Sequence, residues 1–162
     1  MTSFRSAILL ALAARLLPAQ APSAWHAQIG AVWSQPQGDL KQVTPDRSWG
    51  AMLAAQAQET PDGALRLFAE YRRFTTEAGA RFSLSDGGVL LSGTISGPIY
   101  GTLGLSAERI HLPGRDAAIK LGARAGLGWT LGRHASLESA YTTASLDHRR
   151  LDTIETSLVI TF

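Results

Sequence analysis

Three residues with catalytic potential stand two apart near the C-terminus of the chain. His134, Ser136 and Glu138 occupy alternate positions, so on a β-strand all three side chains would project from one face. A histidine with a serine and an acid can supply the base and the nucleophile of acyl hydrolysis. Neighbours two apart on a strand project in parallel, however, which is a poor geometry for direct proton transfer. We therefore expect these residues to join a hydrogen-bond network, with catalysis as the alternative.

Other chemistry-bearing residues form no recognisable site. The glycines Gly122, Gly126 and Gly128 resemble a phosphate loop in spacing, but no helix follows them, so the structural context of such a loop is missing. The charged segment 147–152 could contact phosphate groups through Arg149 and Arg150. The histidines lack the spacing of metal ligands, and we expect neither a metal nor another cofactor. They are His26, His111, His134 and His148.

The first 21 residues have the parts of a secretory signal peptide. Arg5 gives a positively charged start, residues 6–17 are mostly Ala and Leu, and Ala19-Gln20-Ala21 is a small-residue cleavage site. We therefore predict a cleaved signal peptide over 1–21 and one domain over 22–162. No twin-Arg pair precedes the apolar run, which favours general secretion.

Charge and cysteine content exclude two classes of protein. Of the 15 Lys and Arg residues, Arg5 and Arg15 lie in the signal segment, which leaves 13 basic residues against 13 Asp and Glu. A chain without excess positive charge offers no electrostatic basis for nucleic-acid binding. It also contains no cysteine, so it is not a disulfide-stapled scaffold.

The remaining chain alternates apolar and polar residues in eight segments, the pattern of half-exposed β-strands. These are 25–34, 48–58, 64–73, 88–96, 99–110, 119–131, 134–144 and the terminal segment that ends at Phe162. The fourth segment is the weakest and could extend back to Arg81 with a bulge at Gly87-Gly88. After the signal segment, no apolar run reaches the roughly 20 residues that a spanning helix needs.

The connections between these segments alternate in length. Tight turns are expected at 60–63, 97–98 and 132–133, and longer polar loops at 35–47, 74–87, 111–116 and 145–152. Short turns at one rim and long loops at the other are typical of bacterial outer-membrane barrels, in which the short turns are periplasmic. The sequence therefore predicts an all-β, eight-stranded antiparallel up-and-down transmembrane β-barrel.

Alternation alone does not separate a membrane barrel from a soluble one, but the charged residues of the polar face do. In a narrow lumen, charges must neutralise each other because an unpaired buried charge is costly. The polar face carries four basic and four acidic residues, which we predict to form an ion-pair network that plugs the lumen. They are Arg66, Arg72, Lys120 and Arg124 with Glu70, Glu108, Glu138 and Glu155.

The aromatic residues of the apolar face have the spacing of membrane-interface belts. Trp25 and Trp33 are separated by about 20 Å of barrel height, if each residue rises ~3.3 Å along a strand tilted by ~40°. The apolar band between the aromatic girdles of such barrels is about 25 Å tall. We predict an outer girdle of Trp33, Trp49 and Tyr71 and a periplasmic girdle of Trp25, Trp129 and Phe162.

The last two segments carry a resemblance to a known family. Residues 131–141, Leu-Gly-Arg-His-Ala-Ser-Leu-Glu-Ser-Ala-Tyr, and the terminal Leu158-Val159-Ile160-Thr161-Phe162 resemble the final strands of the OmpA-like outer-membrane β-barrel family. The glycine-rich segment 121–128 is similar too. The resemblance covers about 22–162 and implies insertion by the outer-membrane assembly machinery through the C-terminal strand. We expect no peptidoglycan-binding domain after the barrel, so the resemblance does not imply the envelope tethering of full-length OmpA.

These observations lead to one expectation and two alternatives. We expect a monomeric barrel in the outer membrane of a Gram-negative bacterium, in contact with outer-membrane lipid and lipopolysaccharide, with a structural or surface-interaction role. One alternative is a lipid A-modifying hydrolase, since a lipid A deacylase barrel uses a His-x-Ser pair on a strand, as at His134 and Ser136. The other is a soluble, periplasmic lipocalin-like barrel that binds lipid.

Overall fold

The structure, a computed structural model, describes residues 25–44, 47–60, 63–76, 79, 81–111, 117–146 and 149–162. The predicted signal peptide lies outside these residues. The described chain forms eight strands and one short helix, α2: β1 (Trp25–Gln37), α2 (Gly38–Val43), β2 (Ser48–Thr60), β3 (Gly63–Thr75), β4 (Arg81–Ser96), β5 (Ile99–His111), β6 (Ala118–Thr130), β7 (Ala135–Leu146) and β8 (Arg149–Thr161). Among the described residues, no helix is long and apolar enough to cross a membrane.

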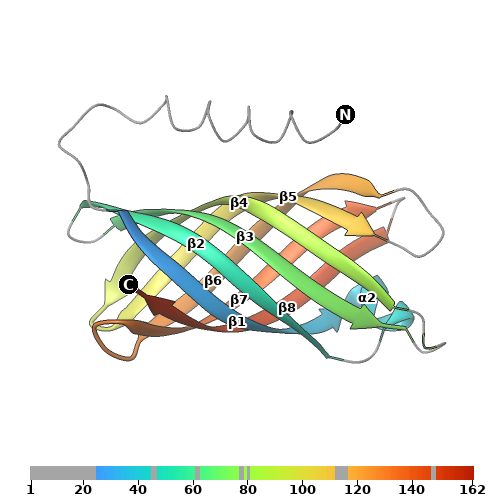
Figure 1. Cartoon of the computed structure of the whole chain (residues 1–162), viewed down its shortest axis with the longest axis horizontal. Helices are drawn as coiled ribbons and strands as arrows, with labels where there is room; N and C mark the ends of the chain where they lie inside the picture. The colour runs from blue at the N-terminus through green and yellow to red at the C-terminus, as the bar shows by residue number, and fades with distance from the viewer. Residues whose placement is uncertain are drawn as a thin grey trace.

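The strands form a closed antiparallel barrel with up-and-down order (Figure 1). Each strand pairs with the next along the chain, and β8 closes the barrel against β1 from Gln28 opposite Thr161 to Gln37 opposite Asp152. The backbone N–H of Phe162 adds a further bond to the carbonyl of Ala27, at 2.9 Å. The eight-stranded fold predicted from the alternation is therefore confirmed.

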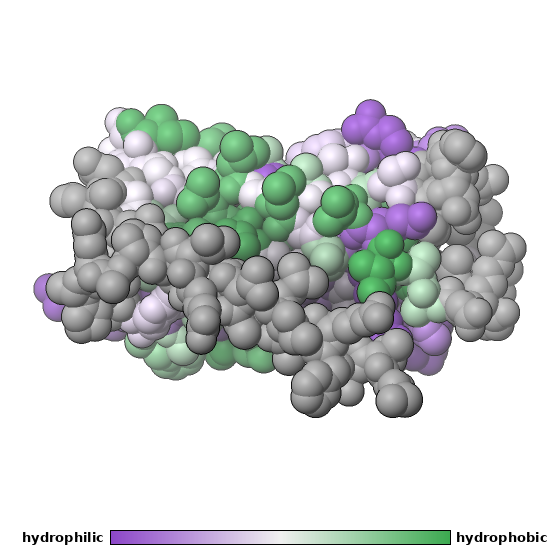
Figure 2. All heavy atoms as spheres, turned by 90° about the horizontal axis from the view of Figure 1, so that it is seen from above, coloured by the Kyte–Doolittle hydropathy of each residue, from purple (hydrophilic) through white to green (hydrophobic). Residues whose placement is uncertain are grey.

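The two faces of each strand differ sharply in exposure. On β5, Ser106 and Glu108 point inward and are buried, whereas the outward-facing Leu105 is 70% exposed. The same outward exposure of large apolar side chains occurs around the barrel, for example at Leu121 and Trp129. Figure 2 shows hydrophobic side chains over the middle and left of one face, and hydrophilic ones toward the right end, where α2 lies in Figure 1.

Strand β4 corrects one detail of the sequence analysis. It begins at Arg81, and its ladder runs through the glycine pair without a bulge: Gly87 lies opposite Ala69 on one side and Ala107 on the other. The bulge predicted there is wrong. Gly88 instead allows close approach between strands, since a Cβ at this position would lie 2.8 Å from the Cα of Ser106. The ladder irregularities occur near turns, between Gln58 and Thr60 and between Thr94 and Ser96.

The predicted long loops are also shorter than expected. β3 continues to Thr75 and β8 starts at Arg149, so much of segments 74–87 and 145–152 is strand, and α2 occupies part of 35–47. The reason is an apolar cluster inside the end of the barrel that carries α2. It holds the strand ends together, because the inward side chains there are large and hydrophobic. This apolar cap consists of Leu40, Phe74, Phe82, Leu84 and Ile110.

The apolar cap lies inside the barrel at the end that carries α2. The rings of Phe74 and Phe82 stack at 5.0 Å between centroids, and Leu40 of α2 is buried against them. Deeper in the barrel, a second apolar cluster includes Val32, Met52 and Phe68. Hydrophobic side chains therefore fill part of the interior beside the polar ones.

We expect Leu84→Ala to lower the free energy of unfolding by about 2–5 kcal/mol, because it removes buried side-chain volume from the apolar cap and leaves a cavity. Leu103→Ala is the matched control, since Leu103 faces outward and is 65% exposed. Surrounding lipid or detergent fills the space left by Leu103→Ala, so no cavity remains. This control should therefore lose less free energy of unfolding than Leu84→Ala. Urea unfolding in lipid vesicles, followed by Trp fluorescence, measures both. Equal losses would contradict an apolar cap that packs as a core.

Candidate functional site

Arg72 on β3 is the centre of an ion-pair network inside the barrel. Its guanidinium is 1% exposed; Nε lies 3.0 Å from Glu70 and Nη2 lies 3.3 Å from Asp86. Nη1 contacts Glu155 and donates to the hydroxyl of Thr153 at 3.1 Å. One buried arginine thus holds carboxylates from β3, β4 and β8.

A second arginine completes this central network from the opposite wall. Nη1 of Arg124 on β6 lies 2.9 Å from Glu70 and 2.9 Å from Glu155. The carboxylates of Glu70 and Glu155 are therefore each shared between Arg72 and Arg124. These pairs span the lumen, because they join β3, β6 and β8, which are not neighbours in the barrel order.

A separate ion pair lies nearer the mouth formed by the short turns. Arg66 on β3 contacts Glu138 on β7 through two nitrogens, at 2.7 and 2.9 Å. The hydroxyl of Tyr100 donates to the same carboxylate at 2.6 Å, and Arg66 also reaches the side-chain oxygen of Gln56. We call the Arg66–Glu138 ion pair, together with the Tyr100 hydroxyl that donates to it, the lower ion pair, because it lies nearer the short turns than the Arg72 network does.

Two of the predicted lumen residues stand apart from both groups. Glu108 is buried and lies opposite Lys120 across β5 and β6. Among the described residues, neither forms an ion pair, and the Oε1 atom of Glu108 has no hydrogen-bond partner. A Cβ at Gly122 would lie only 2.5 Å from that oxygen, so the glycine makes room for this carboxylate.

Sequence reasoning missed Asp86, which belongs to the central network. It falls in the loop expected over 74–87, because the alternation predicts a strand that starts at Gly88. The alternation nevertheless indicates its position, because Asp86 is an even number of residues from the buried Leu84 and Leu90 and so shares their face of the strand. The extension to Arg81 places Asp86 in the lumen only without the bulge predicted at Gly87-Gly88, because the ladder there is regular.

The catalytic candidates do not come together as a hydrolase site. His134 is exposed, and its Nδ1 atom lies 3.1 Å from the backbone oxygen of Thr161. Glu138 is occupied by Arg66 and Tyr100. Within the described part of the chain, no hydrogen bond links the side chains of His134, Ser136 and Glu138.

The predicted girdle residues lie on the outer face. Trp49 is 69% exposed, while Trp33 is half-buried because its ring stacks on Trp49 at 5.9 Å and the Arg47 guanidinium lies 4.7 Å above it. Tyr71 follows on β3 and is exposed. At the other end, the exposed aromatic residues are Trp25, Trp129 and Phe162.

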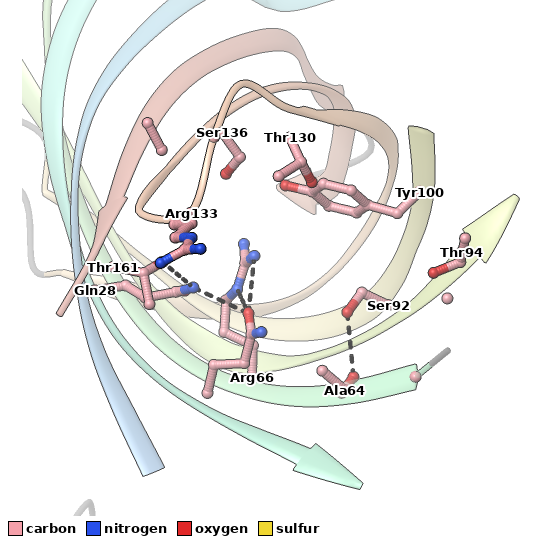
Figure 3. A pocket seen from close by; sticks show the side chains of 15 residues that line it. Gln28, Ala64, Arg66, Ser92, Thr94, Tyr100, Thr130, Arg133, Ser136 and Thr161 are labelled. Carbon is pink, nitrogen blue, oxygen red and sulfur yellow. Dashed lines mark hydrogen bonds between the residues drawn. The ribbon is translucent and has the colours of Figure 1, made fainter. Parts of the chain in front are cut away.

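The clearest cavity lies at the short-turn mouth of the barrel (Figure 3). Its volume is about 240 Å³, and residues from all eight strands line it. Most of the lining side chains are polar, and Arg66 of the lower ion pair forms part of its wall. The described residues form no group of three or more His, Cys, Asp or Glu side chains that could hold a metal ion.

We expect Arg72→Met to lower the free energy of unfolding by about 3–5 kcal/mol, since it leaves three buried carboxylates without their main counter-charge. Arg150→Met is the matched control; Arg150 is 65% exposed and pairs with Asp152, so its loss should stay below about 1 kcal/mol. If Arg72→Met fails to fold, adding Glu155→Gln should recover folding by removing one uncompensated charge. Equal stability of the two single variants in urea unfolding would show that the central network is not needed.

The comparisons with known proteins rest on structure alone. No family model and no curated protein matches the sequence. The crystal structure of Ail, the attachment invasion locus protein of Yersinia pestis, matches with a TM-score of 0.59 and 17% identity over 85% of this chain and 97% of that chain. Ail has also been solved with the heparin analogue sucrose octasulfate.

Two further solved structures have the same fold. Neisserial surface protein A matches with a TM-score of 0.58 and 18% identity over 88% of this chain and 100% of that chain. The N-terminal β-barrel domain of Pseudomonas aeruginosa OprF matches with a TM-score of 0.55 and 12% identity, over 85% and 97%. By its architecture, this chain has the fold of the small eight-stranded outer-membrane β-barrels.

Proposed function

We propose that this protein is a small barrel of the Gram-negative outer membrane, with a structural or surface-interaction role and a lumen plugged by its own side chains. One observation carries the proposal: large apolar side chains face outward around a closed barrel whose ion pairs are buried. Leu121 and Leu105, for example, are 84% and 70% exposed. An apolar outer surface of this extent is a membrane surface, because soluble proteins rarely expose large contiguous apolar patches.

The same observation weighs against a lipocalin-like barrel. A soluble barrel that encloses lipid has its apolar face inside and its charges outside. Here Arg72, Arg124 and Glu155 are inside and almost fully buried, and the described cavity at the mouth is mainly polar. An apolar ligand would therefore have no matching interior.

The ends of the barrel support an orientation. The short turns lie at the end with the C-terminus, and α2 lies at the opposite end (Figure 1). In bacterial barrels the short turns face the periplasm, so α2 and the apolar cap face the cell exterior. The apolar cap and the central network lie in series along the lumen, which favours a barrel that does not conduct ions.

We expect the protein to sediment with the outer membrane and to migrate faster on SDS gels before boiling than after it, because a closed barrel in detergent resists unfolding until heated. Membrane fractionation and a heat-modifiability gel measure these properties. Recovery as a soluble periplasmic monomer without detergent would overturn the proposed location.

The exterior end also carries a cluster of outward-facing arginines. Arg73 on β3, Arg81 on β4 and Arg109 on β5 are exposed and sit on adjacent strands. Arg73 lies opposite Ser83, and Arg109 lies opposite Ser85, two residues further along the same strand. In the described chain none of the three forms an ion pair. We call this group the arginine cluster.

The arginine cluster lies beside the exterior aromatic girdle, because Arg73 is the direct cross-strand partner of Trp49. Arginines at this height meet the phosphates of lipopolysaccharide in the outer leaflet, where a guanidinium can form bidentate hydrogen bonds. From the predicted phosphate-contacting segment 147–152, Arg150 contributes less to this proposal, since it already pairs with Asp152, and residues 147–148 lie outside the described residues. The complex of Ail with a sulfated sugar shows a polyanion bound to another barrel of this fold.

We expect lipopolysaccharide to raise the unfolding temperature of the detergent-extracted barrel, and Arg73→Gln with Arg109→Gln to abolish most of that rise. The double variant Lys41→Gln with Arg150→Gln is the matched control. It removes two positive charges from the same end, outside the arginine cluster, and should keep the rise. Dephosphorylated lipopolysaccharide should raise the unfolding temperature of neither the wild type nor the two double variants. An undiminished effect in the Arg73/Arg109 variant would overturn this contact.

A further inference from the structure

The cavity at the short-turn mouth is a polar vestibule with an unused acceptor. Gln28 is 4% exposed and donates through Nε2 to Gln56 and to Thr161, each at 3.0 Å. Its Oε1 atom has no hydrogen-bond partner, although Gln28 lines the cavity. A buried polar atom without a partner costs free energy. A hydroxyl group of a bound molecule would satisfy it.

The charges of the vestibule are not balanced. The Arg66 charge at its base is neutralised by Glu138. Arg133, in the turn between β6 and β7, also lines the cavity and, within the described residues, has no acidic partner. In the view of Figure 3, the guanidinium groups of Arg133 and Arg66 lie on the same side of the cavity. The vestibule therefore has one positive charge available for an anion.

The opposite side of the vestibule presents a fixed aromatic ring. Tyr100 lies across the cavity from Gln28 and Arg133 in Figure 3, and its hydroxyl is held by Glu138 at 2.6 Å. The ring reaches inward because its cross-strand partner is Gly128, where any Cβ would overlap the ring. A rigid ring facing amide and hydroxyl groups can contact the apolar face of a sugar-like molecule while those groups bind its hydroxyls.

We propose that the vestibule binds a small, polyhydroxylated anion of the sugar-acid class. Its acidic group would pair with Arg133, one hydroxyl would donate to the Oε1 atom of Gln28, and the carbon skeleton would lie against Tyr100. The cavity volume of about 240 Å³ corresponds to roughly eight water molecules, which is room for one monosaccharide unit. Access is from the short-turn mouth, and thus from the periplasm if the orientation proposed above holds.

The test is a titration of the isotope-labelled full barrel in detergent micelles, followed by the amide NMR signals. The probes are D-gluconate, D-glucose and inorganic phosphate, added separately. Gluconate should give saturable shifts at Gln28, Tyr100 and Thr161, with a dissociation constant in the millimolar range or tighter. Glucose, without the charge, and phosphate, without the skeleton, should each bind more weakly.

Two variants make the assignment specific. Arg133→Gln, in an exposed turn, should weaken gluconate binding about tenfold or more, because a charged hydrogen bond is lost. Arg150→Gln removes an exposed arginine from the other end of the barrel and should leave the affinity unchanged. Shifts that grow without saturating would show that the vestibule holds water only. Equal affinity in wild type and Arg133→Gln would overturn the proposed pairing of the anion with Arg133. Neither outcome bears on membrane location, which fractionation decides separately.

Discussion

Closure of the backbone ladder is the constraint on which the rest of this structure depends. Hydrocarbon offers no partner to a free N–H or C=O group, so a sheet inside a membrane can have no open edge. Here the first and last strands satisfy each other over ten residue pairs, from Gln28 with Thr161 to Gln37 with Asp152. The terminal aromatic residue takes part, because the N–H of Phe162 bonds to Ala27 beyond the last pair. A chain that stopped short of this strand would leave two unpaired edges in lipid.

Closure also creates a narrow interior that side chains must fill while pairing most of their buried charges, although Glu108 forms no ion pair among the described residues. The barrel does this in layers: the vestibule at the short-turn mouth, then the lower ion pair, the central network, and the apolar cap beneath α2. Glycines set how far each side chain can reach, as Gly128 does for Tyr100 and Gly122 for Glu108. The order of layers separates two surfaces: a rim of arginine and tryptophan at the end with α2 and a polar cavity at the short-turn mouth.

The strand number, the faces and the closed topology could be predicted from the sequence, because a period of two over 13-residue strands such as β3 and β6 is a strong signal. The limits of β4 and β8 could not. Polar, glycine-containing segments look like loops locally, and only the long-range packing of Phe74, Phe82 and Ile110 extends them as strands. The alternation along the strands indicates that Arg72 and Glu155 face the lumen, but it does not indicate which charged side chains form ion pairs. Glu108 and Lys120 face each other in register and still form no ion pair.

The cross-lumen ion pairs have a kinetic consequence. Arg66 with Glu138 joins β3 to β7, and Arg124 with Glu155 joins β6 to β8, so each pair connects strands that never share a backbone ladder. Such contacts can form only after hairpins distant in sequence have been brought round to face one another, which is late in assembly. Interactions that are absent from the transition state for folding act mainly on the unfolding rate. The buried charges thus have little effect on the rate at which the strands assemble, but they slow the unfolding of the completed barrel.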